Sequence, residues 1–193
     1  MAAGGAFWRY SLKLYGSPPV AEACLALQDA HDIDVNLLLL CCWTGGSGQV
    51  LSAARMAQLI AAAEPWHDCV VKPLRSVRRW LKTQDQAPAE AAERLRQAVK
   101  AHELEAERLE QAILAAEADL FAPTAPDAGP GPLAVAGANL SAYMIHLGLD
   151  LTPDDDRNLA VLLAAANPKA SLDQARAALG ASAGTPGLYP EGL

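Results

Sequence analysis

Apolar side chains recur along most of this chain at intervals of three and four residues, which is the period of an α-helix. Alternating runs of β-branched and aromatic residues are missing, so no strand is predicted. The pattern predicts helices at residues 7–15, 19–31, 35–44, 49–63, 65–82, 88–120, 140–147 and 153–166, and a short last helix from Ser171 to Gly180. The sequence therefore predicts an all-α fold: an N-terminal helical bundle with a long amphipathic helix and a C-terminal helical pair.

The segment from Val35 to Thr44 is apolar on nearly every side, so we expect it to be the central helix of the bundle. Asp34 is placed to cap its first turn, and Gly45-Gly46 is expected to end it. Its longest apolar run has seven residues, far fewer than the about twenty that cross a bilayer. We therefore predict no membrane insertion.

Changes in composition divide the chain into five parts. They are the helical bundle (1–86), the long amphipathic helix (87–121), a flexible Pro/Gly-rich linker (122–137), the helical pair (138–180) and a disordered tail (181–193). Pro73 falls inside the helical pattern of residues 65–82 and predicts a kink or a break there. Capping signals mark other helix ends: Ser47, Gly148, Thr152, and Ser171 with Gln174.

The composition limits the partners of the protein. The chain has 193 residues with a net charge of −7, so nucleic acid and anionic lipid would repel it as a whole. Its residues are 52% apolar and 19% charged, which is typical of a folded domain. The first fifteen residues do not resemble a secretory signal, and the four cysteines form no C-x-x-C pair. We therefore predict a cytoplasmic protein that does not bind nucleic acid.

Polar side chains on the apolar face of residues 19–31 are the first candidates for a site. On a helical wheel Gln28 and His31 fall within the apolar stripe, where an unpaired polar group costs about 1 to 3 kcal/mol. Asn36 lies on one face of the next helix with Trp43, seven residues further on. The ligand-binding candidates are therefore Trp8, Gln28, His31, Asn36 and Trp43. The simpler alternative is that the amides tie helix ends together and that His31 interacts with a helix C-terminus.

Known catalytic and metal-binding motifs are missing from the sequence. There is no G-x-S-x-G, H-E-x-x-H, P-loop or G-x-G-x-x-G motif. A metal site built from Cys24, His31 and Cys41 or Cys42 would match no closed zinc spacing, so we predict no metal and no cofactor. Buried cysteines of this kind are commonly inert core residues. The sequence assigns no catalytic residue.

Basic residues form a stripe on the predicted helix at 65–82. The anion-binding candidates are Lys72, Arg75, Arg79 and Lys82, spaced i, i+3, i+7 and i+10 on one face. A phosphate or nucleic-acid surface is one interpretation. The alternative is that the stripe pairs with the acidic helix that follows it, and the net negative charge favours this alternative.

The long helix carries a narrow apolar seam with a heptad period. One position of the seam holds Ala92, Val99, Ala106, Ile113 and Leu120, and the other holds Leu95, His102, Leu109 and Ala116. Such a seam suits a helical hairpin or a weak coiled coil. We therefore predict a protein partner, or self-association, through residues 92–120.

The opening of the chain resembles an uncharacterised family of short proteobacterial proteins, a domain of unknown function. The resemblance rests on FWRYSL, LQD and DVNLLL in this sequence; it is specific over residues 7–44 and looser to about 120. Members commonly have a glycine near the position of Asp32 or Ile33, which this chain lacks. The resemblance implies a bacterial, cytoplasmic, helical protein and transfers no activity.

Two functions follow as hypotheses from the sequence. The first is a non-catalytic helical interaction or adaptor protein, because the seam of the long helix needs a partner. The alternative is a small-molecule-binding or enzymatic site within the N-terminal bundle. Whether the protein is an enzyme stays open.

Overall fold

The computed structural model describes residues 3–119 and 130–183 of the chain. These residues form helices joined by short connections and contain no strand, which confirms the all-α prediction. The elements are α1 (Ala3–Tyr15), α2 (Pro18–His31), α3 (Val35–Gly46), α4 (Ala53–Trp66), the π-helical turn η1 (His67–Val71), α5 (Lys72–Thr83), α6 (Ala89–Asp119), α7 (Pro132–His146), α8 (Pro153–Ala166) and α9 (Leu172–Ala183).

Helix α3 is the centre of the core, as its apolar sequence predicts. Its residues from Leu37 to Cys42 are all buried, with 3% exposure or less. It packs along α7 and also contacts α1, α2, α6 and α8. The same core includes Phe7 of α1, Leu114 of α6 and Leu162 of α8. The C-terminal helices therefore share one hydrophobic core with the N-terminal ones.

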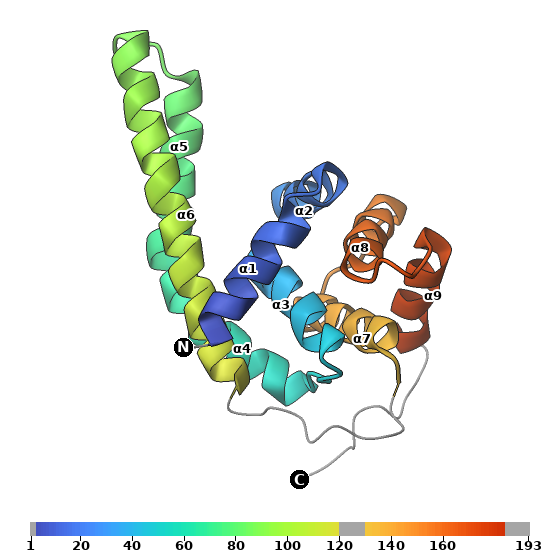
Figure 1. The fold of residues 1–193 in the computed structure, drawn as a ribbon. Coiled ribbons are helices and arrows are strands. Elements are labelled where there is room, and N and C mark those ends of the chain that lie inside the picture. Colours follow the sequence, from blue (N-terminus) through green and yellow to red (C-terminus); the bar gives the residue numbers. More distant parts are fainter. Residues whose placement is uncertain (1–2, 120–129, 184–193) are drawn as a thin grey trace.

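Helices α5 and α6 form an antiparallel hairpin that extends beyond the rest of the molecule (Figure 1). After leaving α5, the long helix α6 packs against α1, α3 and α4. Helices α7, α8 and α9 gather on the side of α2 and α3 that is away from the hairpin tip. No helix in the described part of the chain is both long and apolar enough to span a bilayer.

The end of α3 differs from the prediction. The helix continues through Gly45 and Gly46, and Gly48 with a φ of 78° ends it. The Gly48 amide donates to the Gly45 carbonyl oxygen at 3.0 Å, which belongs to a Schellman cap. Gly45 serves packing instead, because a Cβ on it would lie 2.3 Å from the Ala136 Cα of α7. The missing side chain allows α3 and α7 to approach closely.

Three predicted caps are confirmed at the beginnings of helices: Asp34 at α3, Thr152 at α8 and Ser171 at α9. At α8 the cap is reciprocal, since the Asp155 carboxylate also accepts from the backbone amide of Thr152. Such local hydrogen bonds depend on residues three apart, so the sequence alone predicts them.

Helix α4 begins later than the prediction of 49–63 with Ser47 as its cap. Ser52 caps it instead. The residues before Ser52 form a loop because Asn139 of α7 binds their backbone. Its Oδ1 accepts from the Leu51 amide at 2.8 Å. A residue distant in sequence therefore sets this helix boundary.

The turn between α2 and α3 is left-handed at Asp32, which has a φ of 53° and a ψ of 31°. Its amide donates to the Gln28 carbonyl oxygen at 2.9 Å and so ends α2. Glycine is the residue that adopts this conformation most easily. In this chain Asp32 adopts it, and aspartate is one of the few other residues that do so.

The kink expected at Pro73 takes the form of a π-helical turn just before it. Helix α4 continues through Pro65, and η1 then joins it to α5. The Lys72 amide donates to the carbonyl of His67, five residues earlier. Proline removes a donor and crowds the preceding turn, and the wider π-helical turn accommodates it.

Helix α7 begins at Pro132, so the linker predicted at 122–137 extends too far at its C-terminal end. Proline at the first helical position favours such a start. Gly137 lies inside α7. A Cβ there would come 2.9 Å from the Ala178 carbonyl oxygen of α9, so the glycine allows α9 to pack closely against α7. Helix α9 in turn reaches Ala183, past the predicted end at 180. Residues 122–129 of the predicted linker and 184–193 of the predicted tail lie outside the described residues.

Candidate functional site

Asp34 joins the beginning of α3 to α7. Its Oδ1 accepts from the backbone amide of Asn36 at 2.8 Å, which is the capping bond of α3. Its own amide donates to the hydroxyl of Tyr143 at 3.2 Å. Because these contacts fix the backbone and one carboxylate oxygen, Oδ2 is directed toward His67.

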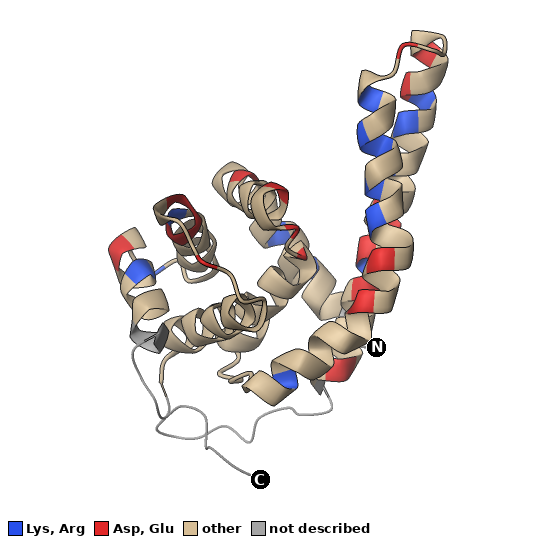
Figure 2. Ribbon diagram, turned by 180° about the vertical axis from the view of Figure 1, so that it is seen from behind, with Lys and Arg blue, Asp and Glu red and all other residues tan. Residues whose placement is uncertain are grey.

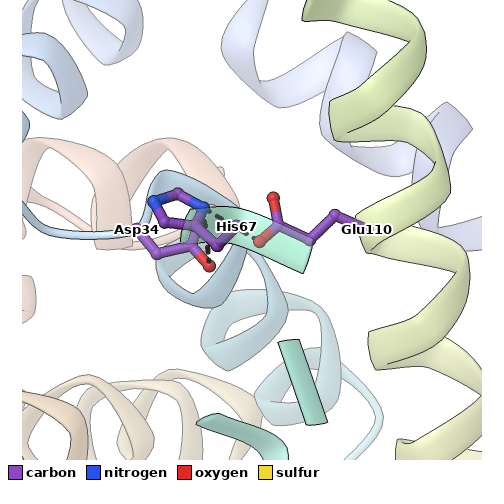
Figure 3. A group of neighbouring side chains, drawn as sticks. All are labelled: Asp34, His67 and Glu110. Atoms are coloured by element: carbon purple, nitrogen blue, oxygen red, sulfur yellow. Dashed lines mark hydrogen bonds and ion pairs between the residues drawn. The ribbon is translucent and has the colours of Figure 1, made fainter. Parts of the chain in front are cut away.

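A buried histidine lies between two buried carboxylates (Figure 3). The Nδ1 of His67, the first residue of η1, is 2.9 Å from Oε1 of Glu110 on α6 and 3.7 Å from Oδ2 of Asp34. Glu110 is 0% exposed, His67 is 5% exposed and Asp34 is 8% exposed. We name these three residues the carboxylate–histidine cluster.

Burial sets the electrostatics of this cluster. It raises the pKa of Asp34 to about 7, with a further contribution from the negative charge of Glu110. For His67, burial alone would lower the pKa. The hydrogen bond to Glu110 and the charge of Asp34 outweigh burial, so the pKa of His67 is raised. Burial thus favours the neutral form of Asp34, and the neighbouring carboxylates favour the protonated form of His67.

Two amide side chains extend from the cluster. Asn36 Nδ2 donates to Glu110 Oε2 at 2.6 Å, and Gln111 Nε2 donates to Asn36 Oδ1 at 2.8 Å. A carboxylate can only accept, so it fixes the orientation of Asn36, which in turn fixes that of Gln111. Gln111 Oε1 therefore remains as an acceptor, and it has no hydrogen-bond partner among the described residues.

Next to this chain of amides lies a cavity of about 510 Å³. Its lining comes from α1, α2, α3, α5 and α6 and the residues before α3. The polar and charged residues in it are Ser11, Gln28, Asp34, Asn36, Arg75, Arg78, Lys100, Glu103, Glu107 and Gln111. The larger apolar ones are Trp8, Leu12, Tyr15, Leu25, Val35, Leu39 and Leu104. The cavity thus combines an apolar wall with a set of converging polar groups.

Two lining residues carry buried atoms without a partner. Ser11 is 2% exposed and Gln111 is 1% exposed, yet Ser11 Oγ and Gln111 Oε1 make no hydrogen bond within the described residues. Buried polar groups normally have partners, and each exception calls for an explanation. A ligand in the cavity would supply one.

The structure brings three of the five ligand-binding candidates together. Trp8, Gln28 and Asn36 all line the cavity. His31 does not: its Nε2 is 3.0 Å from Oδ2 of Asp155 on α8, because α8 packs against α2 at this point. Trp43 does not line it either.

Trp43 stacks on Phe7 of α1, with the ring centroids 5.1 Å apart. Asn36 and Trp43 are seven residues apart on α3, but Asn36 lines the cavity whereas Trp43 packs on α1. The two rings form a packing contact of the core.

A second cavity, of about 600 Å³, lies between α7, α8 and α9. Its lining is largely apolar, with charged groups such as Asp156, Arg157 and Arg176. None of the unpartnered buried atoms found in the described residues belongs to this lining. It therefore gives a weaker indication of a specific ligand than the first cavity.

Most of the basic stripe on α5 is neutralised within the chain. Acidic residues lie beside the basic ones along the hairpin (Figure 2). The ion pairs join Lys72 to Asp32 and Asp68, Arg75 to Glu103 and Glu107, and Arg79 to Asp29. Lys82 is exposed. Intramolecular pairing therefore accounts for three of the four anion-binding candidates. Their acidic partners lie on α2, just after α2, on η1 and on α6, so the stripe does not pair with α6 alone.

Only one of the two heptad positions of the α6 seam packs against the rest of the molecule. In the described part of the helix, one heptad position faces the molecule: Ala92 and Ala106 are buried, and Val99 and Ile113 are half-buried. The other position is exposed: Leu95, His102, Leu109 and Ala116. The inward face departs from a constant heptad seam because α6 packs against several helices, α5, α4 and α1.

The sequence analysis missed His67, Glu110, Gln111 and Ser11 as site residues. A signal for Glu110 exists in the sequence: the inward face of α6 runs through Val99, Glu103, Ala106, Glu110 and Leu114. An acid within an apolar helical stripe needs a partner when it is buried. No local signal singles out His67, because only the fold brings it to Asp34 and Glu110.

The comparisons with known proteins give one match. A family model described as "Protein of unknown function (DUF2390)" matches residues 6–114, more than half of the chain. No curated protein and no solved structure matches. The matched range contains the carboxylate–histidine cluster, Asn36, Gln111 and Ser11. The chain therefore belongs to the DUF2390 family, in agreement with the resemblance seen in its opening residues.

Proposed function

We propose that the chain binds a small polar molecule in the cavity between α1, α2, α3 and α6. The observation that carries the proposal is the pair of unpartnered buried atoms, Ser11 Oγ and Gln111 Oε1, in the lining of one cavity. Leaving such atoms unsatisfied costs about 1 to 3 kcal/mol each. A bound molecule that supplies hydrogen bonds recovers this cost.

The polarity of the amide chain restricts the chemistry of the ligand. Since Glu110 orients Asn36 and Gln111, the atom that Gln111 offers to the cavity is an acceptor. The ligand must therefore present a donor there, such as an amine or a hydroxyl group. Trp8, Tyr15 and Leu39 provide an apolar wall for the remainder of the molecule.

A thermal-shift screen tests the proposal directly. The full chain is heated with a panel of amines, sugars, amino acids and nucleosides, each at millimolar concentration. A ligand present at a hundred times its Kd stabilises the folded state by about 2.7 kcal/mol and raises the Tm accordingly. We expect at least one donor-bearing compound to do so, whereas a panel without any stabilising compound would contradict the proposal.

Two variants locate the binding. Ser11→Ala removes an unpartnered hydroxyl, so it should leave the free protein as stable or more stable while weakening the ligand found in the screen. Gln111→Met should weaken it as well. Ser141→Ala is the matched control: its Oγ donates to the Leu179 carbonyl at 3.2 Å, and it lines the second cavity and not this one, so this change should leave binding unaltered. Equal binding by Ser11→Ala and wild type would show that the ligand lies elsewhere.

The interaction role of residues 92–120 is a second candidate. It is favoured by the exposed row on α6, in which Leu95 is 54% exposed and Leu109 is 38% exposed. Trp80 on α5 is also exposed, at 56%. Apolar side chains in such a row can be covered by a partner helix.

Sedimentation of the full chain measures this interaction. We expect association at micromolar concentration that the double substitution Leu95→Glu and Leu109→Glu abolishes, because two buried charges would face the partner. The substitution Ala101→Glu, at an exposed position of α6 outside the row, serves as the control. A strict monomer that captures no partner protein argues against the interaction role.

A further inference from the structure

The three residues of the carboxylate–histidine cluster direct one ligand atom each toward a common centre. One ligand atom from each residue lies within 4.8 Å of those of the other two. Around an ion bound at about 2.0 to 2.2 Å, neighbouring ligand atoms are about 3 to 3.5 Å apart. The measured separations from Nδ1, 2.9 and 3.7 Å, bracket that spacing. Small side-chain rotations would therefore place all three atoms at bonding distance from one ion.

A single residue holds both carboxylates in this orientation. The Asn36 amide N–H donates to Asp34 Oδ1, and the Asn36 side chain donates to Glu110 Oε2. In each carboxylate the outer oxygen is thus occupied and the other oxygen faces His67. Hydrogen bonds to the outer atoms of ligands are the usual way in which proteins orient a metal site.

The charge of the cluster also suits a divalent cation. Two carboxylates and one imidazole are buried together, so their charge is compensated either by protons on these groups or by a bound cation that replaces them. Arg75, whose charge acts on His67, forms its own ion pairs with Glu103 and Glu107. A divalent ion bound to two carboxylates and a neutral imidazole leaves the buried site without net charge.

We propose that Asp34, His67 and Glu110 bind one divalent transition-metal ion, with the remaining coordination positions open. An imidazole ligand beside two carboxylates favours Zn²⁺, Mn²⁺ or Fe²⁺ over Mg²⁺ and Ca²⁺, which prefer oxygen alone. This site differs from the cysteine set considered in the sequence, since His31 pairs with Asp155 and Cys41 donates to a backbone carbonyl. The prediction of no metal overlooked it because the ligands come from three separate segments.

Metal titration of the full chain tests the site. The protein carries Cys69→Ser, since the exposed thiol of Cys69 can bind zinc by itself. After treatment with a chelator it is titrated with Zn²⁺, Mn²⁺, Mg²⁺ and Ca²⁺ by calorimetry. We expect one tight site per chain for Zn²⁺, a weaker one for Mn²⁺, and no such site for Mg²⁺ or Ca²⁺. No site of unit stoichiometry for any transition metal would overturn the proposal.

Variants assign the ligands. His67→Ala and Glu110→Gln should each weaken Zn²⁺ binding by at least about 100-fold. Glu110→Gln keeps the shape and an acceptor for Asn36, so its circular dichroism should match that of wild type even if His67→Ala fails to fold. His31→Ala removes the other paired histidine and should bind as wild type does. Unchanged affinity in folded Glu110→Gln would place the metal elsewhere and overturn the assignment.

Co²⁺ absorption reports on the metal site without a bound small molecule and without any enzymatic activity. Co²⁺ bound to nitrogen and oxygen ligands at an open site should give ligand-field absorption that the Glu110→Gln variant loses. The metal titration and the ligand screen are independent, because Ser11→Ala should leave metal binding intact. Failure of one proposal is therefore distinguishable from failure of the other.

Discussion

Replacing Gly45 by alanine is expected to lower the free energy of unfolding by about 4 kcal/mol. A Cβ at this position would lie between 2.3 and 2.5 Å from three atoms of Ala136: its Cα, its Cβ and its backbone nitrogen. Two of these atoms are backbone, so no side-chain rotation can relieve the overlap. Helices α3 and α7 would have to separate at the centre of the core, with loss of close packing along both. Urea denaturation followed by circular dichroism measures the effect.

Gly46→Ala is the matched control for this prediction. Gly46 is the last residue of α3, is exposed, and has nothing within 4 Å of a Cβ placed on it. Alanine in a helix is more stable than glycine by about 0.5 to 1 kcal/mol. We therefore expect this variant to equal or exceed wild type. If Gly45→Ala were as stable as Gly46→Ala, the close contact between α3 and α7 would be wrong.

Asn139→Ala is expected to cost about 4 kcal/mol, the second large effect. Asn139 is 0% exposed. Its Oδ1 accepts from the Leu51 amide, and its Nδ2 donates to the Gln49 carbonyl at 2.9 Å and to Thr44 Oγ1 at 3.1 Å. Alanine would remove these bonds, leave the buried Leu51 amide without its partner and create a cavity. Urea denaturation of wild type and variant gives the difference.

The same substitution at Asn167 provides the comparison. Asn167 is half-buried at the end of α8, where its Nδ2 donates to the Leu163 carbonyl at 3.0 Å. Water can replace that bond in the variant, so we expect a loss of at most about 1 kcal/mol. A loss at Asn139 no larger than the loss at Asn167 would contradict the role of Asn139 in holding the loop before α4.

Those residues of the candidate site whose burial follows from the periodicity of a single helix could be predicted from the sequence. Gln28 falls on the apolar stripe of α2, and Asn36 lies in the apolar helix α3, so both were expected to be buried and both line the cavity. His31 lies on the same apolar stripe and is largely covered, but its partner is Asp155 of α8 and not a residue of the cavity. Periodicity indicates which face is buried and carries no information about which helix covers it.

The remainder of the site depends on contacts between distant segments. The sequence does not single out Glu110 among the acids of the long helix, because a heptad seam leaves position 110 outside the apolar face. A seam of constant period requires one partner along the whole helix. Helix α6 instead packs against α5, α4 and α1, and Glu103 and Glu110 lie in its buried face.

The sequence by itself determined the helical class, the central position of α3 and the caps at Asp34, Thr152 and Ser171. These features arise from hydrogen bonds and apolar spacing within a few residues, which the order of amino acids specifies directly. Only the tertiary structure decided that α3 continues through Gly45 and Gly46 and that Gly45 lets α7 approach. It alone also brought Asp34, His67 and Glu110 together, because the distance between atoms far apart in the chain is set by how the helices pack.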